Sequence, residues 1–224
     1  MNYVNIALGK GRLADKTFDL LEKIDIRFKD YHQKSRKLIF VNDEEKIRIV
    51  FVKASDVAIY VEQGAADIGV VGKDTLLESG AGVYEIMDLG FGKCKFAVAA
   101  PEAFMRKPDR KIKVATKYPN VAKKYFYEKG EPIEIIKLNG SVELAPIMGL
   151  SDMIVDIVET GKTLKENGLI VVEDICQISA RLIANKASFK TKAENIGRLV
   201  EGLQSFTESC RSDEKMNRQT CEHS

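Results

Sequence analysis

The sequence predicts an α/β fold built from two lobes. Three observations support this prediction. Short apolar runs rich in β-branched residues recur along the chain, several stretches between them have helical spacing, and a stretch rich in glycine and proline interrupts the pattern. Continuous apolar runs are typical of strands that are buried on both faces. We therefore expect mostly parallel strands covered by helices.

The size and charge of the chain suit a globular protein with a buried core. It has 224 residues, of which 45% are hydrophobic and 30% are charged. The net charge of +2 argues against a nucleic-acid binder, which is usually strongly basic. The sequence opens with no signal-peptide pattern and contains no apolar run of eighteen residues. We expect a cytosolic protein with reduced thiols.

The cysteines do not form a metal-binding pattern. There are four of them, none in a C-x-x-C pair, and only His32 and His223 could join them. This spacing argues against a structural zinc site.

The expected strands and helices alternate. Apolar residues at helical spacing predict helices that begin near Leu13, Val57 and Val121, with Gly64 and Gly130 at the ends of the second and third. The expected strands are residues 3–8, 47–52, 67–71, 95–100, 111–116, 133–138, 153–158 and 168–175.

The lobe boundaries follow from the glycines and prolines between residues 90 and 108. A second α/β unit is expected to start there, and the pattern of the first unit returns near residue 173. We expect lobe I to comprise residues 1–92 and about 173–206, and lobe II residues 93–172, with a cleft between them. Residues 207–224 are polar and are expected to form a disordered tail. The sequence shows no internal repeat.

The stretch "DIVETGKTL" (156–164) ends like a P-loop, but Asp156 stands where the first P-loop glycine should be. Two interpretations stay open. Thr160, Gly161 and Thr163 could bind a phosphate through backbone N–H groups and hydroxyls, with Lys162 facing the anion or solvent. Alternatively, the stretch is a strand–turn–helix connection with an ordinary glycine.

Two aspartates accompany this stretch. Asp152 and Asp156 are four residues apart, so both face the same side of a regular strand. A carboxylate at the end of a buried strand is well placed to accept hydrogen bonds from ribose hydroxyls, which we favour for Asp156. For Asp152 two interpretations are open: a ribose contact, or a cap for the turn after Ser151.

Several cations also follow predicted strands. Lys10 and Arg12 flank Gly11 at a strand-to-helix turn, where they would suit a polyphosphate, although they could equally be surface residues. Lys53 ends a strand, and Ser55 or Asp56 is expected to cap the next helix.

Glu143 has no obvious capping role. It lies two residues after Ser141, not the three that a capping box requires, and is either functional or solvated.

Taken together, these segments resemble one family. The stretch "ELAPIMGLSDMIVDIVETGKTL" (143–164) is similar to the signature of ATP phosphoribosyltransferases, and the resemblance extends over about residues 3–205 through blocks such as "ALGKGRL" and "ATKYPNVAKKYF". The matching signature positions are Glu143, Gly149, Ser151, Asp156, Thr160, Gly161, Thr163 and Leu164.

The resemblance implies a fold and an activity. It implies the two-lobed fold of type II periplasmic binding proteins, with a central cleft and no C-terminal regulatory domain, as in the short form of the family. It also implies transfer of phosphoribosyl from phosphoribosyl pyrophosphate to N1 of the adenine of ATP, the first step of histidine biosynthesis. The substrates would carry Mg²⁺, with no metal held by the protein. The implied partner is a regulatory subunit similar to histidyl-tRNA synthetase, in a hetero-octamer.

The same resemblance implies roles for the residues above. Asp156, with Asp152, would hold the ribose hydroxyls, and Glu143 would belong to the substrate site. The 5-phosphate would be bound by Thr160, Gly161, Lys162, Thr163 and Leu164. The catalytic cations that face pyrophosphate and the ATP phosphates would be Lys10, Arg12, Arg36 and Lys53.

One departure concerns residues 53–58, where the family usually begins with arginine and this chain has Lys53. Arginine binds pyrophosphate bidentately, whereas lysine acts as a point charge. Two rival functions stay open beside the enzyme: a cytosolic two-lobed binding protein without catalysis, and a phosphoribosyltransferase that acts on a free base.

Overall fold

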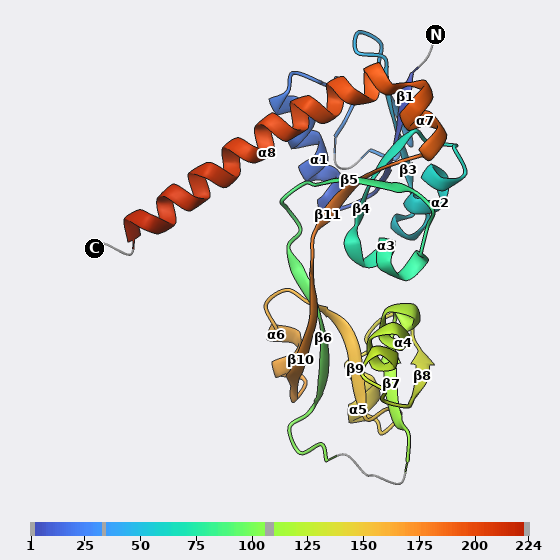
Figure 1. Cartoon of the computed structure of the whole chain (residues 1–224), viewed down its shortest axis with the longest axis vertical. Helices are drawn as coiled ribbons and strands as arrows, with labels where there is room; N and C mark the ends of the chain where they lie inside the picture. Colours follow the sequence, from blue (N-terminus) through green and yellow to red (C-terminus); the bar gives the residue numbers. More distant parts are fainter. Residues whose placement is uncertain (1–2, 33–34, 106–109, 222–224) are drawn as a thin grey trace. The chain divides into compact units, whose positions relative to one another are not determined.

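The structure, a computed structural model, describes residues 3–32, 35–105 and 110–221, with side chains up to residue 207 (Figure 1). It divides the chain into two compact units. Unit 1 comprises Met1–Thr75, Ala81–Phe91 and Ala180–Ser224, and unit 2 comprises Leu76–Gly80 and Gly92–Ser179.

Unit 1 contains a six-stranded sheet in the order β2-β3-β1-β4-β11-β5. The strand β1 pairs in parallel with β3 and β4, whereas β11 is antiparallel to both β4 and β5. The short β2 is antiparallel to β3. The strands are β1 (Val4–Gly9), β2 (Ile39–Asn42), β3 (Ile47–Val52), β4 (Ile68–Gly72), β5 (Tyr84–Asp88) and β11 (Ala180–Ala184).

Helices of unit 1 follow the strands along the chain. In α1, the buried residues Ala14, Phe18 and Leu21 recur at helical spacing and join one apolar core with the strands and with Ile196 and Leu199 of α8. The helices are α1 (Arg12–Lys23), η1 (Ala54–Asp56), α2 (Val57–Glu62), α7 (Lys186–Thr191) and α8 (Ala193–Cys221). The helix α3 (Lys73–Ser79) is divided between the units, because Leu76–Gly80 belongs to unit 2.

Unit 2 contains a five-stranded sheet in the order β10-β6-β9-β7-β8. One face packs with α4 (Pro119–Glu128) and the other with α5 (Leu144–Ile147) and α6 (Lys162–Glu166), so each face has an apolar cluster. The strands are β6 (Cys94–Pro101), β7 (Ile112–Thr116), β8 (Ile133–Lys137), β9 (Met153–Val158) and β10 (Leu169–Ile178).

The two sheets share one topology. In unit 1 the order β3-β1-β4-β11-β5 consists of three parallel strands, then an antiparallel strand, then a final strand antiparallel to that one. In unit 2 the order β8-β7-β9-β6-β10 has the same directions. The fold therefore contains a structural repeat that the sequence did not reveal.

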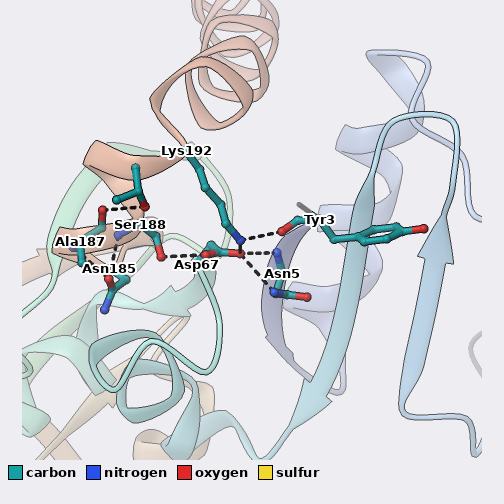
Figure 2. A network of polar contacts seen from close by, with 8 residues as sticks. Tyr3, Asn5, Asp67, Asn185, Ala187, Ser188 and Lys192 are labelled. Atoms are coloured by element: carbon teal, nitrogen blue, oxygen red, sulfur yellow. Dashed lines mark hydrogen bonds and ion pairs between the residues drawn. The ribbon is translucent and has the colours of Figure 1, made fainter. Parts of the chain in front are cut away.

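A polar network closes the amino-terminal edge of the unit 1 sheet (Figure 2). Asp67, which is 4% exposed, accepts hydrogen bonds from the backbone N–H of Asn5 (2.8 Å), the Ser188 hydroxyl (2.7 Å) and the Lys192 ammonium (2.7 Å). Lys192 also donates to the carbonyl of Tyr3 at 2.7 Å. Because each oxygen of this buried carboxylate has a partner, the network ties the segment between α7 and α8 to β1 and β4.

The predicted strands are confirmed, with ends that differ by at most three residues, but the structure adds β2, β5 and β11. The expectation of mostly parallel strands is wrong, because only four of the nine strand pairings described are parallel. The second boundary lies after Ser179 and not near residue 172, since β10 pairs with β6 as far as Ile178.

The end of the chain also differs from its prediction. The structure extends α8 to Cys221, where a disordered tail was expected from residue 207; residues 222–224 lie outside the described part. Lysine, glutamate, glutamine and arginine all have high helix propensity, so a polar segment can continue a helix without an apolar face. None of the described helices combines the length and the apolar character needed to cross a bilayer.

Candidate functional site

The first part of the site is Asp156 on β9. Its neighbours two residues away, Ile154 and Val158, belong to the apolar cluster beneath α5 and α6, so the Asp156 carboxylate lies on that same face. Burial raises the pKa of Asp156, and the negative charge of Glu143 raises it further, against the backbone N–H of Ile157 and the Lys117 ammonium. A carboxylate in such surroundings is unfavourable for packing and is suited to binding hydroxyl groups.

Glu143 lies directly before α5. Val142 and Ala145 on either side of it are buried in the cluster beneath α5 and α6, which fixes this segment over the face that carries Asp156. Glu143 occupies the N-cap position without a side-chain capping hydrogen bond, which confirms that it does not serve as a cap. The two carboxylates are therefore close enough to repel one another.

The predicted phosphate loop is a turn between β9 and α6. Gly161 has φ of +73°, a left-handed conformation that favours glycine, and the buried Leu164 anchors the helix that follows. The Thr160 hydroxyl accepts a hydrogen bond from the backbone N–H of Lys162 at 3.4 Å. The N–H groups of Thr163 and Leu164 lie in the first helical turn, which provides them with no partner inside the helix.

Lys162 contributes little to this turn through its side chain. Its ammonium lies 3.8 Å from Glu166 one helical turn later, and its side chain is 81% exposed. The interpretation of Lys162 as a solvated residue is therefore favoured over a P-loop lysine.

Lys117 is a residue of this site that the sequence interpretation missed. It directly follows β7, whose last residue Thr116 pairs with Val155, so Lys117 lies next to Asp156 across the sheet. Ala115 and Ile154, two residues before them, both belong to the cluster beneath α5 and α6, so Lys117 and Asp156 share a face. The signal in the sequence was its place directly after a predicted parallel strand.

The structure favours a structural role over the ribose contact considered for Asp152. Asp152 lies just before β9, at the end opposite to the Gly161 turn. Arg110 donates to both of its carboxylate oxygens, and the backbone N–H of Lys113 donates to it at 2.8 Å. These hydrogen bonds, led by that from Arg110, lower the pKa of Asp152. These contacts hold Asp152 at the start of β9, and we do not include it in the candidate site.

In unit 1, the predicted cations follow adjacent parallel strands. Lys10 and Arg12 come after β1 and Lys53 after β3, so both turns lie at the carboxyl edge of the sheet. A Cβ on Gly9 would meet the Cα of Ala54 at 2.7 Å, so only glycine allows the two turns to pack this closely.

Arg36 lies near these cations, because the residue before it contacts Lys10. The Lys10 ammonium donates to the carbonyl of Ser35 at 3.2 Å, which places the segment containing Arg36 beside the β1 turn. Lys10, Arg12, Arg36 and Lys53 are all exposed. Their arrangement presents several cations at one edge of unit 1, as a polyphosphate site requires.

The predicted helix cap near Lys53 is different in detail. Asp56 precedes α2 without a side-chain capping hydrogen bond, and the Ser55 hydroxyl instead donates to Asp56 at 2.8 Å. The short η1 turn explains this difference, because it occupies the residues where a capped helix was expected.

Comparisons with known proteins place the chain in a family. A family model described as "HisG: ATP phosphoribosyltransferase" matches residues 53–205. The ATP phosphoribosyltransferase of Clostridioides difficile (strain 630) is 59% identical over 207 residues, which cover 91% of this chain and 99% of that protein. The ATP phosphoribosyltransferase of Clostridium botulinum (strain ATCC 19397 / Type A) is 55% identical over 206 residues, covering 91% and 97%.

A solved structure is similar as well. A chain of the ATP phosphoribosyl transferase (HisG:HisZ) complex from Thermotoga maritima matches with a TM-score of 0.80 and 36% identity, covering 92% of this chain and 99% of that chain. These matches confirm the resemblance that the signature over residues 143–164 indicated. The chain belongs to the ATP phosphoribosyltransferase family.

Proposed function

We propose that this chain is a catalytic subunit that transfers phosphoribosyl from phosphoribosyl pyrophosphate to N1 of the adenine of ATP. The bond between C1 of the ribose and pyrophosphate breaks, and a bond between C1 and N1 forms. This is the first step of histidine biosynthesis. The observation that supports it most is the partly buried Asp156 next to Glu143 and to the glycine turn, within a chain of this family.

Unit 2 is proposed to bind the phosphoribosyl group. The backbone N–H groups of residues 160–164 would hold the 5-phosphate, since glycine at 161 allows close approach of an anion to the turn. Asp156 and Glu143 would accept hydrogen bonds from the ribose hydroxyls. The partly buried position of both carboxylates supports this role, because hydrogen bonds to ions are stronger away from water.

The cations of unit 1 are proposed to bind pyrophosphate and the ATP phosphates. Lys10, Arg12, Arg36 and Lys53 would stabilise the negative charge that develops on the leaving group. Mg²⁺ would enter as part of the substrate complexes, and no group of protein side chains is assigned to it. Lys53 would act as a point charge where relatives of the usual pattern have an arginine.

The proposed chemistry needs no general base. N1 of adenine carries a free lone pair, so it can attack C1 directly once the leaving group is stabilised. The tasks of the protein are to hold the 5-phosphate, to stabilise the oxocarbenium-like ribosyl centre and pyrophosphate, and to orient the adenine. Electrostatic groups suffice for these tasks.

The finer fold and the assembly are also proposals. The type II periplasmic-binding-protein fold is supported by the five strands of each sheet that share one order and one set of directions. A regulatory subunit similar to histidyl-tRNA synthetase, in a cytosolic hetero-octamer, is supported by the HisG:HisZ complex that contains the structural relative.

The test combines the purified chain with such a regulatory subunit, ATP, phosphoribosyl pyrophosphate and Mg²⁺. We expect a phosphoribosylated adenine product, seen as new ultraviolet absorbance and identified by mass spectrometry. Controls leave out either substrate or replace the chain with Asp156→Ala. If the complete mixture gives no product while calorimetry shows binding of an amino acid or sugar, the chain is a binding protein and the proposal is wrong.

A further inference from the structure

Lys117 lies next to Asp156 across the sheet. The register that pairs Thr116 with Val155 continues to Lys117 and Asp156, and the side chains alternate regularly as far as Tyr118, which belongs to the opposite cluster. The Lys117 ammonium lies 5.7 Å from the centre of the Tyr118 ring. Among the residues whose side chains the structure describes, 3–32, 35–105 and 110–207, no carboxylate forms an ion pair with Lys117.

The two carboxylates near Lys117 come from different elements of the fold. Asp156 lies on β9, whereas Glu143 lies directly before α5, which packs on the same face of the sheet. Two negative charges on one partly buried face repel each other, so a nearby cation favours the ionised form of Asp156. Lys117 is the neighbouring-strand cation that acts on Asp156 in this way.

We propose that Lys117 is a positioning residue, which keeps Asp156 ionised so that this carboxylate can accept hydrogen bonds from the ribose hydroxyls. The inference rests on the proposed function for its ligand, phosphoribosyl pyrophosphate. It adds a residue of the β7 end to a site otherwise formed by β9 and the segments around α5 and α6. A protonated Asp156 would keep a single acceptor oxygen and would lose the charge that strengthens its hydrogen bonds.

Other charged groups around Asp156 have different partners. On β6, Lys95 is two residues from Ala97, which pairs with Asp156, but its ammonium lies 2.7 Å from Asp174 of β10. On α6, the ammonium of Lys162 lies 3.8 Å from Glu166, and Lys165 is exposed. Glu143, directly before α5, remains the acidic neighbour.

Lys137 provides a matched control. It ends β8, the strand next to β7, and pairs with Thr116 at the same edge of the sheet. Its neighbours Ile136 and Leu138 pack against the cluster beneath α5 and α6, so Lys137 itself faces the other side. The Lys137→Gln variant removes the same charge from the same edge without touching the Asp156 face.

The experiment titrates the carboxyl carbon of Asp156 by NMR in wild type, Lys117→Gln, Lys117→Arg and Lys137→Gln, with Asp156→Asn used to assign the signal. We expect the pKa of Asp156 to be higher in Lys117→Gln than in wild type. It should be unchanged in Lys137→Gln and restored in Lys117→Arg. Equal titration curves in all four proteins would overturn the inference.

The second measurement is calorimetric binding of phosphoribosyl pyrophosphate with Mg²⁺ across pH. We expect Lys117→Gln to bind about tenfold more weakly, the loss that follows when one charge-assisted hydrogen bond is removed. The acid limb of its binding curve should move to higher pH. A shifted titration with unchanged binding contradicts the positioning role. Absence of binding in wild type contradicts the proposed function, and the titration then still decides whether Lys117 acts on Asp156.

Discussion

Asp67 and Asp152 hold the same position in the two sheets. Asp67 precedes β4 and Asp152 precedes β9, the two strands that correspond in the shared topology. Each donates its backbone N–H to a carbonyl at the start of the neighbouring strand (2.9 Å, Asn5 or Lys113) and accepts that same residue's N–H on its carboxylate (2.8 Å). Both aspartates therefore clamp the start of a parallel strand pair.

These shared hydrogen bonds predict that Asp152 is needed for stability and not for turnover. Asp152→Ala should lower the free energy of unfolding by about 1–3 kcal/mol, because Arg110 and the backbone N–H of Lys113 lose a charged acceptor. Its KM for phosphoribosyl pyrophosphate should stay within about twofold of wild type. Urea denaturation and steady-state kinetics check both effects, and Asp67→Ala is the matched variant in unit 1. A large rise in KM would return Asp152 to the substrate site.

The stability that Asp152 contributes should decrease at acid pH. The Arg110 hydrogen bonds lower the pKa of Asp152 below the ordinary value of 3.8. The stability that Asp152 contributes is thus fully present above pH 3.8 and is lost as pH falls through the lowered pKa. The difference in unfolding free energy between wild type and Asp152→Asn should shrink over that acid range. A constant difference would show that the charge of Asp152 contributes nothing.

Asp156 is predicted to have the opposite effect. Burial raises its pKa above 3.8, so its ionised form destabilises the folded chain at neutral pH. Asp156→Asn should raise the unfolding free energy by roughly 0.5–2 kcal/mol while weakening phosphoribosyl pyrophosphate binding at least about tenfold. The gain should vanish as wild type becomes protonated at low pH. Thermal melts from acid to neutral pH test it; a less stable variant would contradict the prediction.

The glycine turn allows a comparison of two similar substitutions. Gly161 and Gly168 flank α6 with φ of +73° and +69°. Alanine at either position should cost roughly 1–2 kcal/mol of stability, because a Cβ disfavours the left-handed conformation. Only Gly161→Ala should also weaken binding of phosphoribosyl pyrophosphate in calorimetry. Equal binding losses in the two variants would mean that the turn has no special part in phosphate binding.

Lys53 is predicted to tolerate arginine. Lys53→Arg should preserve or raise kcat/KM, since a guanidinium can bind pyrophosphate through two hydrogen bonds. Lys46→Arg, at the opposite end of β3, is the control and should leave the kinetics unchanged. A large loss in Lys53→Arg alone would indicate that position 53 does not face the leaving group.

The strands predicted from sequence were those with long apolar runs, and the missed strands lacked this signal. β2 and β5 are the outer strands of the unit 1 sheet and bury less, so their residues alternate weakly. β11 is an inner strand but follows β10 after Ser179 alone, so no glycine or proline separates the two strands in the sequence. The mixed strand directions depended on which strands become neighbours, which no local pattern records.

The residues of the candidate site also fall into those that the sequence indicated and those that it did not. Asp156 and the Gly161 turn are close in sequence, and their spacing indicated one site. Arg110, which binds Asp152, and Lys117, which acts on Asp156, come from segments far from β9 in the chain. Their proximity depends on the pairing of β7 with β9, so a single sequence showed the carboxylates without the cations that distinguish them.

The insertion of β11 between β4 and β5 determines the order in which the sheets can be completed during synthesis. Unit 2 is complete in the chain by Ser179, whereas unit 1 still lacks this central strand. A growing polypeptide therefore exposes the unpaired edge of β4 until more than a hundred further residues have been added. Such an edge is open to pairing with other chains, so the interval before β11 emerges is when the nascent protein is most prone to aggregate.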